Sequence, residues 1–189
     1  MSPLGAARAV ITSGGADVKG SLILLETQTA SSSLLDFEAL QESTYNVHFF
    51  TLTDINVTTQ TEIGYRLSDD GGTTYETGYE FVNQRGYASG TWAERKSASQ
   101  NTARLGGDVT TDTNSVFNGY MYLYNAGDSS RWTYSSSHCT FNQGSTYTME
   151  FGSQLYATAS TINGIRFGEG VSMGAITSGT ISCYGIQES

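Results

Sequence analysis

Tyr120-Met121-Tyr122-Leu123-Tyr124 alternates strictly between aromatic and aliphatic side chains. Successive side chains on a β-strand point to opposite faces, so this stretch is expected to carry its three tyrosines on one face and its two aliphatic side chains on the other. Because both sets of side chains are largely apolar, both faces of the strand are expected to pack partly against other parts of the protein or of an assembly.

A second alternating stretch lies at residues 63–68 and ends in a turn signal. Its apolar side chains, Ile63, Tyr65 and Leu67, are expected to face the core, with Arg66 and Ser68 facing out. The sequence Asp-Asp-Gly-Gly follows at residues 69–72, and Asp-Gly and Gly-Gly supply the positive φ values of tight turns. We expect a hairpin here that folds back into residues 73–79.

Similar segments rich in β-branched and aromatic residues recur along the chain between Gly, Asn, Asp and Ser clusters. They predict strands at residues 22–29, 45–52, 62–68, 79–84, 91–96, 115–124, 131–141, 147–156, 162–167 and 180–186. No helical period of useful length appears, and residues 32–40 are expected to form at most one turn. About ten strands without intervening helices favour an all-β fold, an antiparallel β-sandwich that is jelly-roll-like.

The length of 189 residues fits one domain. Residues 1–20 contain the single proline, Pro3, and no hydrophobic period, which predicts a short extended N-terminal arm. Residues 21–189 are expected to form the sandwich domain.

The composition argues against several classes of protein. The 12 Tyr and 8 Phe supply the apolar area that disordered chains lack. A net charge of −9 disfavours direct binding to nucleic acid. No apolar run approaches the roughly 18 residues of a membrane span, so membrane insertion is not expected.

The two cysteines, Cys139 and Cys183, have no Cys-x-x-Cys partner and fit neither a disulfide scaffold nor a zinc site. We expect both to be small buried hydrophobic residues, with a disulfide between them as the alternative. The two histidines, His48 and His138, have no histidine partner at ligand spacing, so packed or edge positions are expected.

Three loops contain residue types used in catalysis or ligand binding, but each lacks the neighbouring residues or the spacing that such a site needs. The Gly-Asp-Ser at residues 127–129 resembles a nucleophile turn and lacks a well-placed histidine base. Asp108, Asp112 and Asn114 offer calcium ligands, but their spacing misses the usual loop, so a solvated loop is expected. Residues 168–174 are glycine-rich without a following helix, which predicts a turn. No motif selects a catalytic carboxylate pair, and no catalytic residue, cofactor or metal is predicted.

The aromatic residues form the most conspicuous candidate surface, namely Tyr120, Tyr122, Tyr124, Trp132 and Tyr134. They fit a sugar-stacking platform, and they fit cross-strand pairs in a core or an interface equally well.

The C-terminal part of the chain contains two distinctive stretches, Ser160-Thr-Ile-Asn-Gly-Ile-Arg-Phe167 and Gly174-Ala-Ile-Thr-Ser-Gly-Thr-Ile-Ser-Cys-Tyr-Gly-Ile186, of which the final Tyr-Gly-Ile is the most specific part. Together they resemble the closing hairpin of small virion structural proteins of tailed bacteriophages, particularly those of marine and cyanobacterial hosts. Residues 22–37, 45–55 and 65–75 fit in the same order. Cys183 departs from the pattern, where an aliphatic residue is usual.

This resemblance implies a jelly-roll-like subunit that assembles on the phage particle, commonly as a homotrimer. It implies either a capsid decoration (cement) protein on the capsid exterior, bound to the major capsid protein or another virion protein, or a fibre or receptor-binding component. The single-domain length favours decoration. A tail-fibre or receptor-binding module that contacts host glycans is the alternative. The arm is the expected capsid or partner contact, through Pro3, Leu4, Arg8, Val10 and Ile11.

Overall fold

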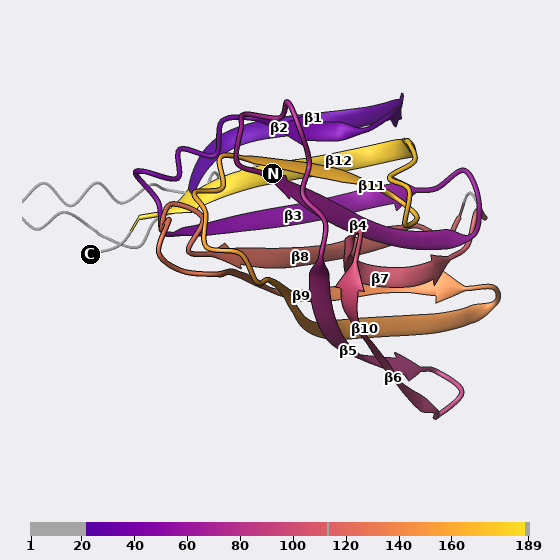
Figure 1. Cartoon of the computed structure of the whole chain (residues 1–189). Coiled ribbons are helices and arrows are strands. Elements are labelled where there is room, and N and C mark those ends of the chain that lie inside the picture. Colours follow the sequence, from indigo (N-terminus) through magenta and orange to yellow (C-terminus); the bar gives the residue numbers. More distant parts are fainter. Residues whose placement is uncertain (1–21, 113, 188–189) are drawn as a thin grey trace, which may run out of the picture.

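The computed structural model describes residues 22–112 and 114–187, which form two antiparallel β-sheets packed face to face (Figure 1). These two ranges contain no helix. The prediction of an all-β, antiparallel sandwich is therefore confirmed, whereas jelly-roll connectivity stays an expectation. The arm predicted for residues 1–20 lies outside the described residues.

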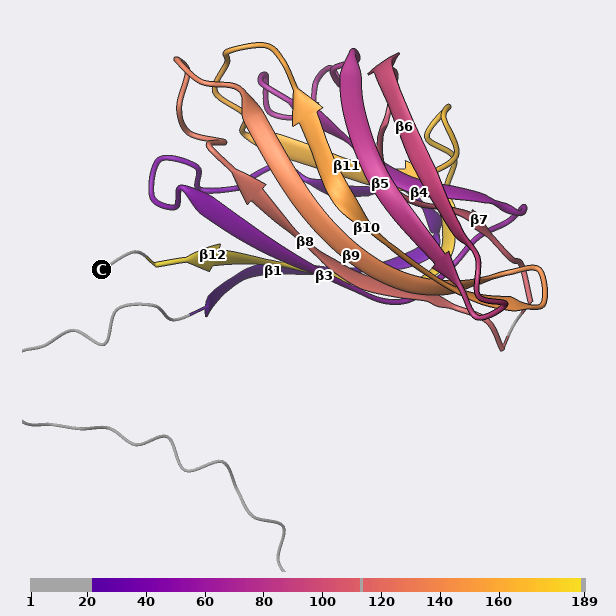
Figure 2. The ribbon, with the colours of Figure 1, turned by 90° about the horizontal axis from the view of Figure 1, so that it is seen from below.

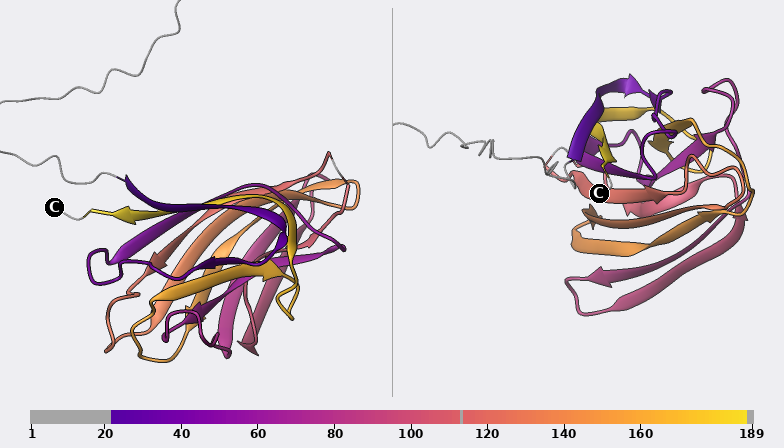
Figure 3. Two further views of the ribbon diagram at one scale, coloured as in Figure 1. Left: turned by 90° about the horizontal axis from the view of Figure 1, so that it is seen from above. Right: turned by 90° about the vertical axis from the view of Figure 1, so that its left-hand side faces the viewer.

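The described residues contain the strands β1 (Leu22–Ser33), β2 (Leu35–Phe37), β3 (Val47–Asn56), β4 (Thr61–Ser68), β5 (Tyr79–Tyr87), β6 (Trp92–Gln100), β7 (Ala103–Val109), β8 (Phe117–Tyr124), β9 (Thr133–Gln143), β10 (Thr146–Tyr156), β11 (Gly164–Glu169) and β12 (Ile176–Ile186). Eight of them form a large sheet in the order β1-β12-β3-β8-β9-β10-β5-β6. The other four form a small sheet in the order β2-β11-β4-β7. Figure 2 shows the large sheet fanning out towards β6, and Figure 3 shows the two layers from two further sides.

All ten predicted strand segments contain a strand, and two strands were not predicted. Residues 32–40, where at most one helical turn was expected, contain none and instead hold the end of β1 and all of β2. The solvated loop expected around Asp108 is also wrong in part. Residues 103–109 form β7, whose two consecutive glycines hide its strand pattern in the sequence.

The hairpin predicted after β4 is wrong in part. The chain does fold back, since the backbone N–H of Glu76 donates to the Leu67 carbonyl oxygen at 2.8 Å, but residues 73–78 form no strand. β4 pairs with β11 and β7 in the small sheet, and the next strand, β5, belongs to the large sheet, so residues 69–78 carry the chain from one layer to the other. The turn at residues 69–72 also covers Ser68, which is buried and not exposed as expected, since Gly72 N donates to Ser68 Oγ at 2.9 Å.

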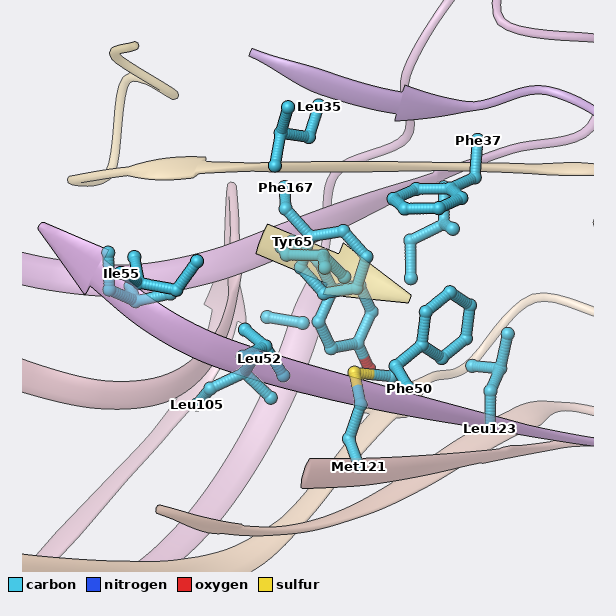
Figure 4. Packing of buried hydrophobic residues seen from close by; sticks show 14 of the residues in the cluster. Leu35, Phe37, Phe50, Leu52, Ile55, Tyr65, Leu105, Met121, Leu123 and Phe167 are labelled. Carbon is cyan, nitrogen blue, oxygen red and sulfur yellow. The ribbon is translucent and has the colours of Figure 1, made fainter. Parts of the chain in front are cut away.

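The apolar core lies between the two sheets, and several aromatic side chains pack against one another at its centre (Figure 4). Phe167 of β11 lies 5.4 Å from Phe50 of β3 and 6.0 Å from Phe37 of β2, measured between ring centroids. Met121 and Leu123 point into this core, as the alternation in β8 predicts. Both cysteines are also buried and free, which confirms the expectation for them.

The interior is polar where β7 packs against β5 and β10. Arg85 Nη2 lies 2.7 Å from Glu150 Oε2, and neither side chain is exposed to solvent. Arg85 also donates to Asp108 at 2.8 Å, and Asn83 donates to the second oxygen of Glu150 at 2.9 Å. Buried polar groups are tolerated when such bonds satisfy them, so this network fixes how β5, β7 and β10 lie against one another.

Candidate interaction surface

The face of the large sheet turned away from the small sheet carries the exposed aromatic residues. In β8, Phe117, Met121 and Leu123 are buried, and the tyrosines between and beyond them are partly or largely exposed. The register continues this face across the sheet, since Tyr122 pairs with Phe49 of β3 and Tyr120 with His138 of β9. We call this surface the outer face.

Eight rings on the outer face form a continuous row, which we call the aromatic belt. It consists of Tyr184, Phe49, Tyr122, Tyr124, Tyr120, His138, Phe151 and Trp92. The closest pair, Phe49 and Tyr122, has ring centroids 4.8 Å apart. Cross-strand aromatic contacts of this kind stabilise the sheet, and they leave one side of each ring open.

Trp92 extends the belt to the last strand of the sheet because Gly86 makes room for it. A Cβ atom at Gly86 would lie 3.0 Å from the indole of Trp92, tighter than ordinary contact. Trp92 also contacts Phe151 at 6.4 Å between ring centroids and is 63% exposed. The largest aromatic side chain of this row is thus held against the sheet and left open to solvent.

Charge is absent from the middle of the outer face. The described outward positions of β8, β9 and β10, and those of β3 from Val47 to Thr53 and of β12 from Thr180 to Ile186, contain no Asp, Glu, Lys or Arg. They contain seven of the eight belt residues, all but Trp92 of β6, together with uncharged polar side chains and the further apolar residues Val47, Tyr134, Tyr147, Met149, Leu155 and Ile186. Depletion of charge with enrichment of aromatic residues is typical of the centre of a protein interface.

Two neighbouring hollows mark the centre of this face. One, of about 430 Å³, lies between Phe49, Thr51 and Asn118 on one side and His138 on the other. The second, of about 580 Å³, lies among Tyr120, Tyr122, Tyr124, Ser136 and Phe151. Tyr120 and His138 line both hollows, so these two rings stand between them.

Hydroxyl groups border the belt at the β1 side of the sheet. Thr27, Ser182 and Thr51 lie in one row across β1, β12 and β3. Thr29, Thr180 and Thr53 form the next row. The Oγ atoms of Thr27 and Ser182 are 2.9 Å apart, within hydrogen-bond distance. The outer face thus combines apolar rings with uncharged hydrogen-bonding groups.

Four of the five predicted aromatic residues, Tyr120, Tyr122, Tyr124 and Tyr134, lie together on the outer face. Tyr134 of β9 is the register partner of Tyr124 of β8. Trp132 lies just before β9 and lines a separate shallow hollow with Arg131 and Tyr134. None of the five belongs to the buried core, so cross-strand pairing in a core does not describe them.

The other belt residues were not predicted because they come from distant parts of the chain. Phe49, Phe151 and Tyr184 each alternate with buried residues in their own strand. That alternation was a signal that these side chains lie on one face. Only the strand order shows that they meet Tyr120 and Tyr122.

The Gly-Asp-Ser segment forms a self-contained turn. Asp128 Oδ1 accepts hydrogen bonds from the backbone N–H of Ser130 at 2.9 Å and from its hydroxyl at 2.6 Å. These bonds hold the pKa of Asp128 below its usual value. His48, the first candidate base, is buried, and its Nε2 lies 2.6 Å from the Leu40 carbonyl oxygen.

The three candidate calcium ligands do not converge. Asp108 faces Arg85 and Arg95, with its Oδ2 at 2.8 and 3.3 Å from their Nη1 atoms. Although burial acts to raise it, the pKa of Asp108 is held below its usual value by the hydrogen bond and charge of Arg85. Asp112 instead accepts from the backbone of Asn114 at 3.0 Å. Residues 170–173 form the predicted turn between β11 and β12.

Within residues 22–112 and 114–187, no three His, Cys, Asp or Glu side chains are grouped so as to hold a metal ion. The same residues include no helix long and apolar enough to span a membrane. Comparison with protein-family models, with curated proteins and with solved structures returns no match.

Proposed function

We propose that this protein is a bacteriophage virion structural protein, a capsid decoration protein that binds the shell as an oligomer and turns over no substrate. The observation that supports this most is the uncharged, aromatic middle of the outer face in a chain of net charge −9. Soluble monomers rarely expose a continuous apolar patch of more than a few hundred Å². A face of this kind is suited to assembly.

In this proposal the sandwich supplies the assembling body and the arm supplies the contact with the shell. Contacts of an arm are repeated at every copy on a regular lattice, so weak contacts add up to stable attachment. The full chain is therefore expected to co-sediment with empty capsids, and a chain lacking residues 1–20 is expected to stay in the supernatant. Equal co-sedimentation of both chains would exclude the arm as the anchor.

The second candidate is a tail-fibre or receptor-binding module for host glycans. The two hollows favour it, because they combine aromatic rings with the hydroxyl and amide groups of Thr51, Ser136 and Asn118. Sugars bind to proteins through such stacking and hydrogen bonding. A glycan array with the purified chain tests this candidate, and binding abolished by Tyr120→Ala would favour it over capsid decoration.

The position and copy number of the protein on purified virions separate the two candidates. Gold labelling combined with quantitative mass spectrometry, scaled to the major capsid protein, measures both. We expect labelling over the whole shell and a copy number close to that of the capsid lattice. A small number of copies confined to one vertex would overturn the decoration role and support the tail role.

A further inference from the structure

We infer that the outer face packs against the outer face of a second copy of this chain. This inference rests on the proposed function, because it names the partner of the surface that the proposal uses. Three observations support a second copy as the occupant: the area of the face, its charge and its shape.

The area of the outer face matches what a stable complex needs. The shortest strand of the large sheet, β8, has 8 residues. Eight strands of this length, spaced about 4.8 Å apart and rising about 3.3 Å per residue, cover roughly 1,000 Å². Each partner in a stable complex typically buries about 800 Å². The apolar residues reach both ends of this area, from Leu22 and Leu24 on β1 to Trp92 on β6.

The charge of the outer face suits a partner of identical charge. Two copies of a chain with net charge −9 repel each other wherever acidic groups meet. The outward carboxylates of β5 and β6 lie near the β6 edge of the sheet: Glu94 is neutralised by Lys96, whose Nζ lies 2.9 Å from its carboxylate, and Glu80 of β5 is exposed beside Leu155. A basic partner would instead favour an acidic docking face, and an acidic partner a basic one.

The shape of the outer face offers both protruding rings and hollows. Phe151 and Tyr120 are each 41% exposed, and two hollows lie beside Tyr120. A two-fold interface requires one face to fit against itself, and a face with both protruding rings and hollows supplies the two features that such a fit needs. Sheets that pack in this way lie about 10 Å apart and bury both sets of side chains.

A charge placed in the middle of the face tests the inference. Ser153 is exposed on β10, between its register partners Ser136 of β9 and Val82 of β5. Ser153→Arg adds a guanidinium that would be buried without a partner when two outer faces meet. The matched control, Ser172→Arg, makes the same change in the exposed turn after β11, next to Val171, whose carbonyl oxygen accepts from Arg66 of the small sheet.

The measurement is sedimentation velocity of the full chain and both variants over a hundredfold concentration range, with thermal unfolding to confirm that each variant is folded. We expect the wild type and Ser172→Arg to form a species of a multiple of 20.3 kDa that dissociates on dilution. We expect Ser153→Arg to weaken association about 100-fold or more. A monomeric wild type, or a folded Ser153→Arg that assembles normally, would overturn the inference.

Different experimental results would overturn the inference and the proposed function. Binding of a strictly monomeric wild type to capsids would leave the proposed function in place and overturn the inference. Self-association abolished by Ser153→Arg in a protein that is absent from the capsid shell would support the inference and overturn the decoration role.

Discussion

Arg85 and Glu150 form an ion pair inside the sandwich, with two guanidinium nitrogens 2.7 and 2.8 Å from one carboxylate oxygen and no solvent exposure on either side chain. Burial opposes the charged form of Arg85, but Glu150 and Asp108 raise its pKa above the usual value. The guanidinium group of Arg85 therefore stays charged at neutral pH despite its burial.

Glu150→Gln is expected to destabilise the fold by about 3–5 kcal/mol, because removing one partner leaves a buried charge incompletely compensated. Urea unfolding followed by circular dichroism measures the change. Glu94→Gln, in the exposed pair with Lys96, is the control and should change stability by less than about 0.5 kcal/mol. Similar effects of the two substitutions would mean that the network does not hold the layers together.

Phe167→Ala and Tyr122→Ala separate the core from the outer face. Phe167 is fully buried among three rings, so its truncation should cost about 3–5 kcal/mol. Tyr122 keeps part of its ring exposed, and we expect a loss of about 1–2 kcal/mol from its cross-strand contacts. Equal losses in unfolding experiments would show that Tyr122 belongs to the core.

Acid is expected to destabilise the protein through His48. Burial lowers the pKa of His48 below the usual 6.5, although the hydrogen bond to Leu40 and the charge of Glu42 act in the opposite direction. The unfolded chain therefore takes up a proton at higher pH than the folded one. The stability that the neutral ring contributes is fully present above pH 6.5 and is lost as the pH falls from 6.5 through the lowered pKa.

The melting temperature measured from pH 8 to pH 5 checks this expectation. His48→Gln keeps a donor for the Leu40 carbonyl group and removes the titrating ring, so the decline below about pH 6.5 should become shallower. An identical pH profile for wild type and His48→Gln would contradict the assignment.

Association through the outer face should not weaken in salt. The face has no charged groups at its centre, and salt screens the repulsion between two acidic chains. The dissociation constant is expected to stay constant or fall when NaCl is raised from about 0.05 to 1 M, at which the screening length drops to roughly 3 Å. A large rise in the dissociation constant would indicate that ion pairs hold the assembly together.

The strands were predictable because alternation is a local signal. Residues 63–68 and 120–124 show it without interruption, and both are strands with the expected side chains facing in, apart from Ser68. β7 was missed because Gly106 and Gly107 lack side chains that could reveal the period. A Cβ at Gly107 would lie within 2.7 Å of three atoms of the Arg104 guanidinium group, so packing, not strand propensity, explains this glycine.

The pairing of strands could not be read from the sequence. Turn residues after β4 satisfy the chemistry of a hairpin, but Ile63, Tyr65 and Leu67 are buried against the large sheet while their strand pairs with β11. Long-range register also assembles the aromatic belt, since Phe49 and Tyr184 are separated by 135 residues and lie opposite each other. The local alternation of residues 120–124 predicted that the tyrosines of β8 share one face. The residues that lie beside them on the neighbouring strands could be identified only from the strand order of the folded protein.

The outer face should be covered when the protein is assembled on the virion, and hydroxyl-radical footprinting measures this coverage residue by residue. The dilute, isolated chain and the protein on purified virions are oxidised under the same conditions, and Val171, which is exposed on the turn after β11, serves as the internal reference. We predict that Tyr120, Phe151 and Trp92 lose most of their reactivity on the virion while Val171 keeps its own. Unchanged reactivity of these three rings would contradict the account.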